Sequence, residues 1–224
     1  MTHPGEALVR SWTANAAAWT RAVRDGGIES RRLVTDDAIV RTVEELRPGR
    51  VLDVGCGEGW LARALAERGM RVTGVDASPE LVEAAQQAGG GDFHAATYDE
   101  LAADPLRFGR DFDAVVCNFS LLDDRPAALL AALREATAQD GSLVIQTVHP
   151  WAAAGDEGYV DGWRTETFAG FGGDFAAPMP WYFRTMASWM DVIAQAGWRL
   201  FRLGEPVHPQ TGRPASLLII AERS

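Results

Sequence analysis

Lysine is absent from this chain of 224 residues, and all 21 basic residues are arginine. The formal net charge is −10, and no run of arginines forms a local basic segment. An acidic surface repels the phosphate backbone of nucleic acids, so we expect no nucleic-acid partner. The chain also lacks an apolar run of 18 residues, so we expect no membrane-spanning helix. Its first ten residues, MTHPGEALVR, carry no apolar stretch typical of a secretory signal.

Cysteine is scarce as well. Cys56 and Cys117 are the two cysteines of the chain, and they do not form a CxxC pair. This argues against a zinc site and against a disulfide scaffold. We therefore expect two buried, reduced thiols and no bound metal in a cytoplasmic protein. We also expect a monomer or a homodimer.

Strand-like and helix-like segments alternate along the chain, which is typical of a mostly parallel sheet. A turn-rich link near the end, too short for a parallel crossover, predicts that the last strand is antiparallel. We predict one α/β domain over 1–224: a Rossmann-like seven-stranded sheet, mostly parallel, with helices on both faces. The expected strands are 50–56, 71–77, 92–97, 112–120, 141–148, 198–206 and 216–223, and the main expected helices are 5–25, 33–47, 59–69, 125–139 and 184–196.

Residues 150–183 interrupt this alternation. They are rich in glycine and proline and contain nine of the chain's twenty aromatic residues. A long irregular stretch is usually functional or disordered, and so many aromatic side chains argue against disorder. A small hydrophobic cluster beneath a loop is one interpretation. We favour an aromatic cap or lid, because aromatic faces attract cations and hold flat or apolar molecules.

A glycine-rich loop follows the first expected strand in the sequence VLDVGCGEGW. Gly55, Gly57 and Gly59 allow a tight turn and let a ligand approach the backbone. Asp76 stands 17 residues after Gly59, at the end of the next strand, where a carboxylate can bind ribose hydroxyls. A dinucleotide site prefers a small third residue in G-x-G-x-x-G/A, but that position is Trp60. Trp60 therefore argues against an NAD-type oxidoreductase without excluding that function.

The motifs resemble those of the class I S-adenosylmethionine-dependent methyltransferases, in particular the ubiquinone-methyltransferase-like group. The first motif is Val51–Gly59, the second is the strand ending in Gly74–Ser78, and a third is the FD-x-V strand at Phe112–Val115. The resemblance covers roughly 35–148 and, more loosely, the final hairpin. It implies S-adenosyl-L-methionine as cofactor and S-adenosyl-L-homocysteine as product, but says almost nothing about the acceptor. We expect a small-molecule acceptor that is methylated on oxygen or nitrogen.

The resemblance also implies a role for each motif residue. Asp53 and the loop Gly55–Gly59, which includes Cys56, would hold the methionine end, and Asp76 the ribose. Adenine would contact Ala77 and either Tyr98 or Asp99. The N-terminal segment 1–47 would close over the cofactor, so that Arg31 reaches its carboxylate. Trp12 and Trp19 share a helix face, and we expect at least one of them to pack on the sheet. The other expected cofactor contacts are Trp19, Asn118, Phe119 and Ser120.

A general base is needed only if the acceptor must lose a proton early. His149 follows the fifth expected strand, at the sheet edge where α/β proteins bind ligands, and an imidazole can take up a proton near neutral pH. Tyr182 is a second candidate. Their simpler interpretation is structural, with His149 opening the turn before Pro150. A protein that binds the cofactor without catalysis remains the third alternative.

Overall fold

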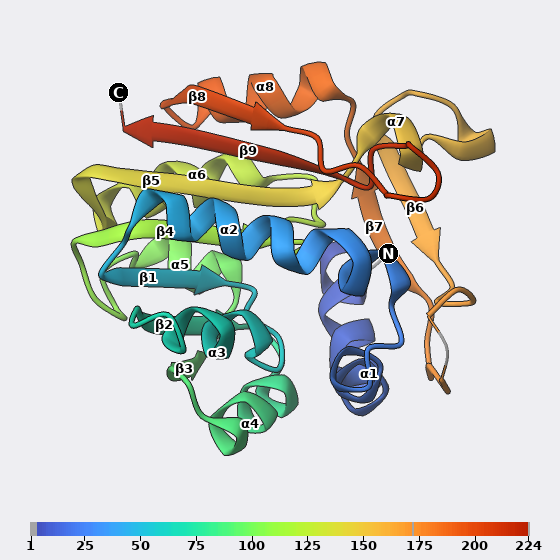
Figure 1. Ribbon diagram of the computed structural model, residues 1–224, viewed down its shortest axis with the longest axis horizontal. Helices are drawn as coiled ribbons and strands as arrows, with labels where there is room; N and C mark the ends of the chain where they lie inside the picture. Colours follow the sequence, from blue (N-terminus) through green and yellow to red (C-terminus); the bar gives the residue numbers. More distant parts are fainter. Residues whose placement is uncertain (1–3, 172, 224) are drawn as a thin grey trace.

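The computed structural model describes residues 4–171 and 173–223 (Figure 1). Residues 1–3, 172 and 224 lie outside this range. The parts of our predictions that fall on them concern the N-terminal segment, the stretch 150–183 and the end of the domain. In the described part of the chain, no helix combines the length and the apolar character needed to cross a lipid bilayer.

A seven-stranded sheet forms the centre of the molecule, with strand order β3-β2-β1-β4-β5-β9-β8. β1 to β5 pair in parallel, whereas β9 lies between β5 and β8 and is antiparallel to both. The predicted topology, with its antiparallel last strand, is confirmed. The strands are β1 Arg50–Val54, β2 Arg71–Asp76, β3 Asp92–Ala95, β4 Phe112–Asn118, β5 Thr137–Val148, β8 Trp198–Gly204 and β9 Ser216–Arg223.

Helices cover both faces of this sheet (Figure 1). α5, α6 and α8 contribute leucine, valine and tryptophan side chains to one core, and α2, α3 and α4 contribute to the core on the opposite face. Central strands are buried on both sides, which explains their continuous apolar sequences. The helices are α1 Pro4–Arg24, α2 Asp36–Leu46, α3 Trp60–Ala66, α4 Pro79–Ala88, α5 Tyr98–Ala103, α6 Pro126–Ala136, α7 Pro150–Ala153 and α8 Met186–Gln195, with a π-helix at Arg31–Thr35 and a 3-10 turn at Gly155–Glu157.

Two differences from the sequence-based expectation concern local structure. α5 was not predicted; Thr97 and Glu100 form a capping box at its start, which stabilises a helix of only six residues. The expectation of an irregular 150–183 is wrong in part, because β6 Gly162–Glu166 and β7 Met179–Phe183 pair as an antiparallel two-stranded sheet. Threonine and aromatic residues favour strands, but the surrounding glycines and prolines concealed this pattern. We call residues 150–183 the cap; α1 packs against its β7 strand.

Candidate functional site

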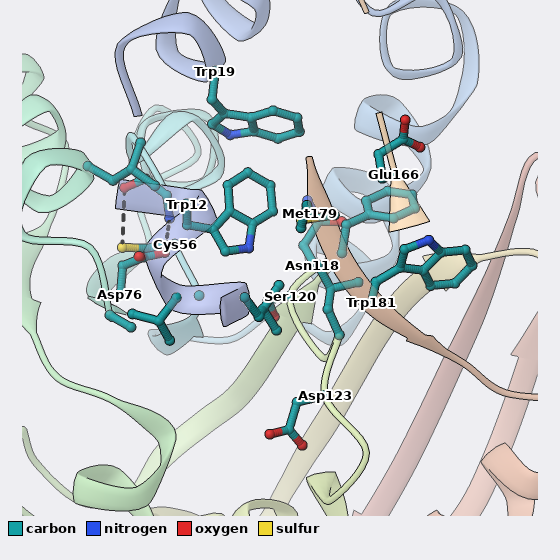
Figure 2. Close-up of a pocket in the computed structure, with 18 of the residues that line it drawn as sticks. Trp12, Trp19, Cys56, Asp76, Asn118, Ser120, Asp123, Glu166, Met179 and Trp181 are labelled. Atoms are coloured by element: carbon teal, nitrogen blue, oxygen red, sulfur yellow. Dashed lines mark hydrogen bonds between the residues drawn. The ribbon is translucent and has the colours of Figure 1, made fainter. Parts of the chain in front are cut away.

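A cavity of about 640 Å³ lies where β1, β2 and β4 end. This volume is within the range of small-molecule sites, and the carboxyl ends of parallel strands are where α/β folds bind ligands. α1 and the cap contribute to the walls of the cavity, and Figure 2 shows Trp12 and Trp19 of α1 and Met179 and Trp181 of the cap around it. Of the predicted cofactor residues, those that line it are Trp19, Arg31, Gly55, Cys56, Gly57, Asp76, Ala77, Tyr98, Asp99, Asn118, Phe119 and Ser120.

The glycine loop has backbone angles and close contacts that demand glycine. Gly55 has φ +77°, and a Cβ atom there would lie 2.3 Å from the Cβ of Ser120. Gly59 has φ +81°, and its Cβ would lie 2.9 Å from Ala85 and Phe93 side-chain atoms. Gly59 is outside the cavity lining. Its contribution is thus the packing of α3 and α4 beside β3, whereas Gly55 keeps the cavity floor open.

Two carboxylates, Asp53 and Asp76, support this loop. Asp76 lines the cavity and accepts hydrogen bonds from the backbone N–H groups of Gly57 and Ser78, both at 2.9 Å. Asp53 lies beneath the loop, outside the lining, with 1% of its surface exposed, and its Oδ2 has no hydrogen-bond partner. Burial, together with the negative charge of Asp76, raises the pKa of Asp53 to about 7. A nearby cation would therefore stabilise the ionised form of the Asp53 carboxyl.

Arg31 presents a buried guanidinium to the same cavity. Its Nε donates a 2.9 Å hydrogen bond to Asp36, and the guanidinium carbon lies 4.5 Å from the centre of the Trp60 ring. Nη2 is buried without a hydrogen-bond partner. An unsatisfied buried donor costs about 1–3 kcal/mol, so an anionic ligand group that reaches Nη2 removes this penalty. Trp60, which is too bulky for a dinucleotide loop, here holds Arg31 in place by cation–π contact.

The wall formed by the end of β4 and the start of α5 is held by hydrogen bonds. The Tyr98 hydroxyl donates to the backbone oxygen of Ser120 at 2.8 Å, and Ser120 Oγ donates to the backbone oxygen of Val54 at 2.6 Å. Burial raises the pKa of Tyr98 well above its ordinary value, so the phenol stays protonated. The side-chain oxygen of Asn118 is buried and unpartnered. This wall is therefore held in place by two hydrogen bonds, and the Asn118 side-chain oxygen is left to accept a hydrogen bond from a ligand.

Aromatic rings join α1 to the cap above the cavity. Trp12 and Trp19 lie edge to face with ring centres 5.0 Å apart. Trp12 also contacts Phe168, and Trp19 contacts Phe171, at 6.3 and 6.1 Å. The expectation that one tryptophan packs on the sheet is wrong, because both line the cavity and contact the cap. The side chain of Asn15 fastens the same two segments by hydrogen bonds to the backbone of Ala176 and Ala177.

The structure does not bring the two predicted catalytic residues to the cavity lining. His149 is 5% exposed at the start of α7, and its Nε2 lies 2.8 Å from Glu205 Oε1. Tyr182 follows Trp181 in β7, and neighbouring strand residues point to opposite sides. Trp181 therefore lines the cavity, whereas Tyr182 packs edge to face on Trp163 and against the Arg184 guanidinium.

Sequence reasoning missed Met179 and Glu166, which also line the cavity. The alternation of Met179 and Trp181 within a strand was the available signal. Cys56 and Cys117 are buried and do not form a disulfide. In the described ranges, no group of three or more histidine, cysteine, aspartate or glutamate side chains is arranged to hold a metal ion.

Comparison with known proteins identifies the central segment. Residues 51–141 match the family described as "Methyltransferase domain". A ubiquinone biosynthesis O-methyltransferase from Xanthomonas oryzae pv. oryzae is 34% identical over 117 residues, covering 49% of this chain and 47% of that protein. The chain therefore spans about half the length of the curated relatives it matches.

Solved structures share the fold over a longer range. The 1,6-didemethyltoxoflavin-N1-methyltransferase of Burkholderia thailandensis, bound to 1,6-didemethyltoxoflavin and S-adenosylhomocysteine, superposes with a TM-score of 0.66 at 24% identity, covering 100% of this chain and 92% of that one. Magnesium protoporphyrin IX methyltransferase from Synechocystis, with bound S-adenosylmethionine, gives 0.65 at 19% identity, covering 100% and 99%. The predicted Rossmann-like fold is confirmed, and it is shared with these methyltransferase structures.

Proposed function

We propose that this chain, whose residues 51–141 form a methyltransferase domain, transfers a methyl group from S-adenosyl-L-methionine to a small molecule. One observation carries the proposal: a single cavity contains the Asp76 carboxylate, the glycine loop and the unsatisfied N–H of Arg31. A nucleoside joined to a zwitterionic amino acid requires these groups together. Asp76 suits the ribose hydroxyls, and Arg31 suits the carboxylate of the methionine part.

The remaining unsatisfied polar atoms fit the same cofactor. The free side-chain oxygen of Asn118 is a suitable acceptor for the amino group of the methionine part. The buried carboxylate of Asp53, beneath the loop, favours the same cationic end when it is ionised. Ala77, Tyr98 and Asp99 line the cavity beside Asp76, where adenine would lie. Neither the position of His149 nor that of Tyr182 supports the proton-transfer role predicted for them.

Once bound, the cofactor supplies the reactive methyl group and its leaving group. The protein's own residues orient the two reactants and keep water away from them, which accounts for much of the rate of such a displacement. Trp12, Trp19 and the cap aromatics form the cover that excludes water. We propose an oxygen or a nitrogen as the acceptor atom. Among the described cavity-lining residues beyond the cofactor loops, Asp123 and Glu166 are available carboxylates for a departing proton.

Two alternatives are disfavoured by specific contacts. Trp60 stands at the position where an NAD site needs a small residue, and its ring is used to contact the Arg31 guanidinium. A cap with an aromatic wall beside the cofactor cavity would serve little purpose in a protein that only binds the cofactor. The net charge of −10 supports a small-molecule acceptor over nucleic acid. A cytoplasmic location and a monomeric or homodimeric state remain part of the proposal.

Calorimetric titration with S-adenosylmethionine, S-adenosylhomocysteine and NAD tests the cofactor assignment. We expect micromolar affinity for the first two and no binding of NAD. Transfer of a deuterated methyl group from the labelled cofactor to extracted small molecules, followed by mass spectrometry, tests catalysis. Tighter binding of NAD would overturn the proposal, and cofactor binding without any labelled product would leave the binding-only alternative.

A further inference from the structure

The part of the cavity beneath the cap is walled by aromatic and apolar side chains. Trp12 comes from α1, Phe168, Met179 and Trp181 come from the cap, and Leu122 follows β4. Figure 2 shows Trp12, Met179 and Trp181 around the space next to Asn118. Phe168 and Met179 are themselves buried, at 3% and 6% exposure, so the wall is held firmly in place. Flat aromatic walls of this kind suit a flat molecule.

The charges that line this part of the cavity are unfavourable for an anion. Among the described residues, the lining contains three arginines, and Arg31 belongs to the cofactor end beside Trp60. The other two are within ion-pair distance of a carboxylate: Arg10 of Glu6 at 3.6 Å and Arg125 of Asp124 at 3.7 Å. The side chains of Arg10 and Arg125 are also 60% and 66% exposed, so water screens them. Asp123 and Glu166 add negative charge to the same lining.

Glu166 is the carboxylate placed on the aromatic wall itself. It ends β6, directly opposite Met179 of β7, and its Oε1 accepts a 2.6 Å hydrogen bond from the backbone N–H of Phe168. This bond fixes a negative charge beside the rings of the cap. A fixed charge at the edge of an apolar cavity acts more strongly than one in bulk water.

We propose, on the basis of the methyltransferase function above, that the methyl acceptor is a flat aromatic or heteroaromatic molecule that is neutral or cationic. Glu166 is a specificity residue: its charge disfavours acceptors that carry a carboxylate or a phosphate. The aromatic wall supplies affinity for the ring system, and Glu166 selects the charge. Acceptors attached to a phosphate-bearing carrier are excluded on the same grounds.

Three bicyclic probes of similar shape test this selection: 2-naphthol, N-methylquinolinium and naphthalene-2-carboxylate. Each is titrated calorimetrically into protein saturated with S-adenosylhomocysteine, so that the cofactor part of the site is filled. We expect 2-naphthol and N-methylquinolinium to bind at least tenfold more tightly than the carboxylate. Glu166→Gln keeps an acceptor for the Phe168 N–H and removes the charge, so it should reduce the difference between 2-naphthol and the carboxylate at least threefold.

Glu135→Gln is the matched control, because Glu135 is exposed and lies outside the cavity lining. It should leave the ranking unchanged. Trp181→Ala should weaken 2-naphthol binding at least fivefold without a comparable loss for S-adenosylhomocysteine. Equal affinity for all three probes, tightest binding of the carboxylate, or no binding of any probe overturns the inference. A protein that fails to bind S-adenosylhomocysteine instead contradicts the proposed function, so the two failures are distinguishable.

Discussion

The side-chain Nδ2 of Asn15 donates a 2.7 Å hydrogen bond to the backbone oxygen of Ala177, 162 residues further along the chain. Its Oδ1 accepts from the backbone N–H groups of Ala176 and Ala177 at 2.7 and 3.2 Å, and Asn15 is 1% exposed. One amide therefore satisfies three backbone groups of the cap. Through it, α1 and the cap are joined into one cover over the cavity.

Asn15→Ala should loosen that cover. The variant leaves the three cap backbone groups without their protein partner, which costs about 1–3 kcal/mol where water cannot replace it. We expect a lower melting temperature, faster amide exchange in 173–179, and several-fold weaker binding of S-adenosylhomocysteine. Thr13→Ala, at an exposed position of α1, is the control. Unchanged amide exchange in the cap would show that the aromatic contacts alone hold the cover.

Asp76→Ala should lower the affinity for the cofactor at least tenfold. The carboxylate would make charge-assisted hydrogen bonds to ribose, each worth about 1.5–3 kcal/mol. It also accepts the Gly57 N–H at 2.9 Å, so the loop loses support as well. Calorimetry with S-adenosylhomocysteine measures the effect, and circular dichroism checks the fold. Asp140→Ala, at an exposed site in β5, is the control; an unchanged affinity in Asp76→Ala would mean that ribose is bound elsewhere.

Cofactor affinity should depend on pH through Asp53. Its carboxyl has a pKa raised from 3.8 to about 7, so the ionised form that favours a cationic ligand dominates above pH 7. We expect binding of S-adenosylmethionine to tighten as pH rises from 6 to 8, and this dependence to disappear in Asp53→Asn. Titrations at three pH values would reveal it. A flat profile in the unmodified protein would contradict the role of Asp53.

The same carboxyl predicts the opposite trend for the free protein. A carboxyl whose pKa is higher in the folded than in the unfolded chain favours folding in its protonated form. Its stabilising contribution is complete below pH 3.8 and is lost as pH rises to about 7. Without ligand, Asp53→Asn should therefore melt at a higher temperature than the unmodified protein at pH 8, with a smaller difference at pH 5. Thermal unfolding at both pH values measures this.

Arg31→Met should discriminate between two ligands. The guanidinium is proposed to bind the carboxylate of the methionine part, and 5′-methylthioadenosine lacks that group. We expect at least a tenfold loss of affinity for S-adenosylhomocysteine and less than a twofold change for methylthioadenosine. Arg32→Met, at the exposed neighbouring position, should affect neither. Equal losses of affinity for both ligands would indicate that Arg31 shapes the cavity through its contact with Trp60 and does not bind the carboxylate.

His149→Gln should lower stability more than turnover. The imidazole is buried, is paired with Glu205 at 2.8 Å, and does not line the cavity. A loss of about 1–2 kcal/mol lowers the melting temperature by several degrees in a domain of this size. Turnover on an acceptor identified by the labelling experiment should stay within threefold. A hundredfold fall in turnover with normal cofactor affinity would restore the catalytic role that the sequence suggested.

Local patterns account for what could be predicted. Gly55 and Asp76 belong to short motifs whose geometry depends on neighbouring residues, and strand and helix segments alternate along the chain. The loop and a mostly parallel sheet with an antiparallel last strand could therefore be inferred from sequence. Asn15 is one polar residue in an alanine-rich helix, and its partner lies 162 positions away. The direction of His149 depends on Glu205, which follows another strand. Such features arise from tertiary contacts, and no periodicity in one sequence reports them.

The long separation between α1 and β7 has a consequence for synthesis on the ribosome. A nascent chain that has reached Ser120 contains the glycine loop, Asp76 and the wall at Asn118, but neither strand of the cap. α1 can already pack against α4, but Asn15 has no cap backbone to bond until residues 176 and 177 emerge, and β9, which lies between β5 and β8, emerges last. Contacts between distant segments form slowly. The ability to retain a ligand is therefore acquired late, after the residues that recognise it have already been made.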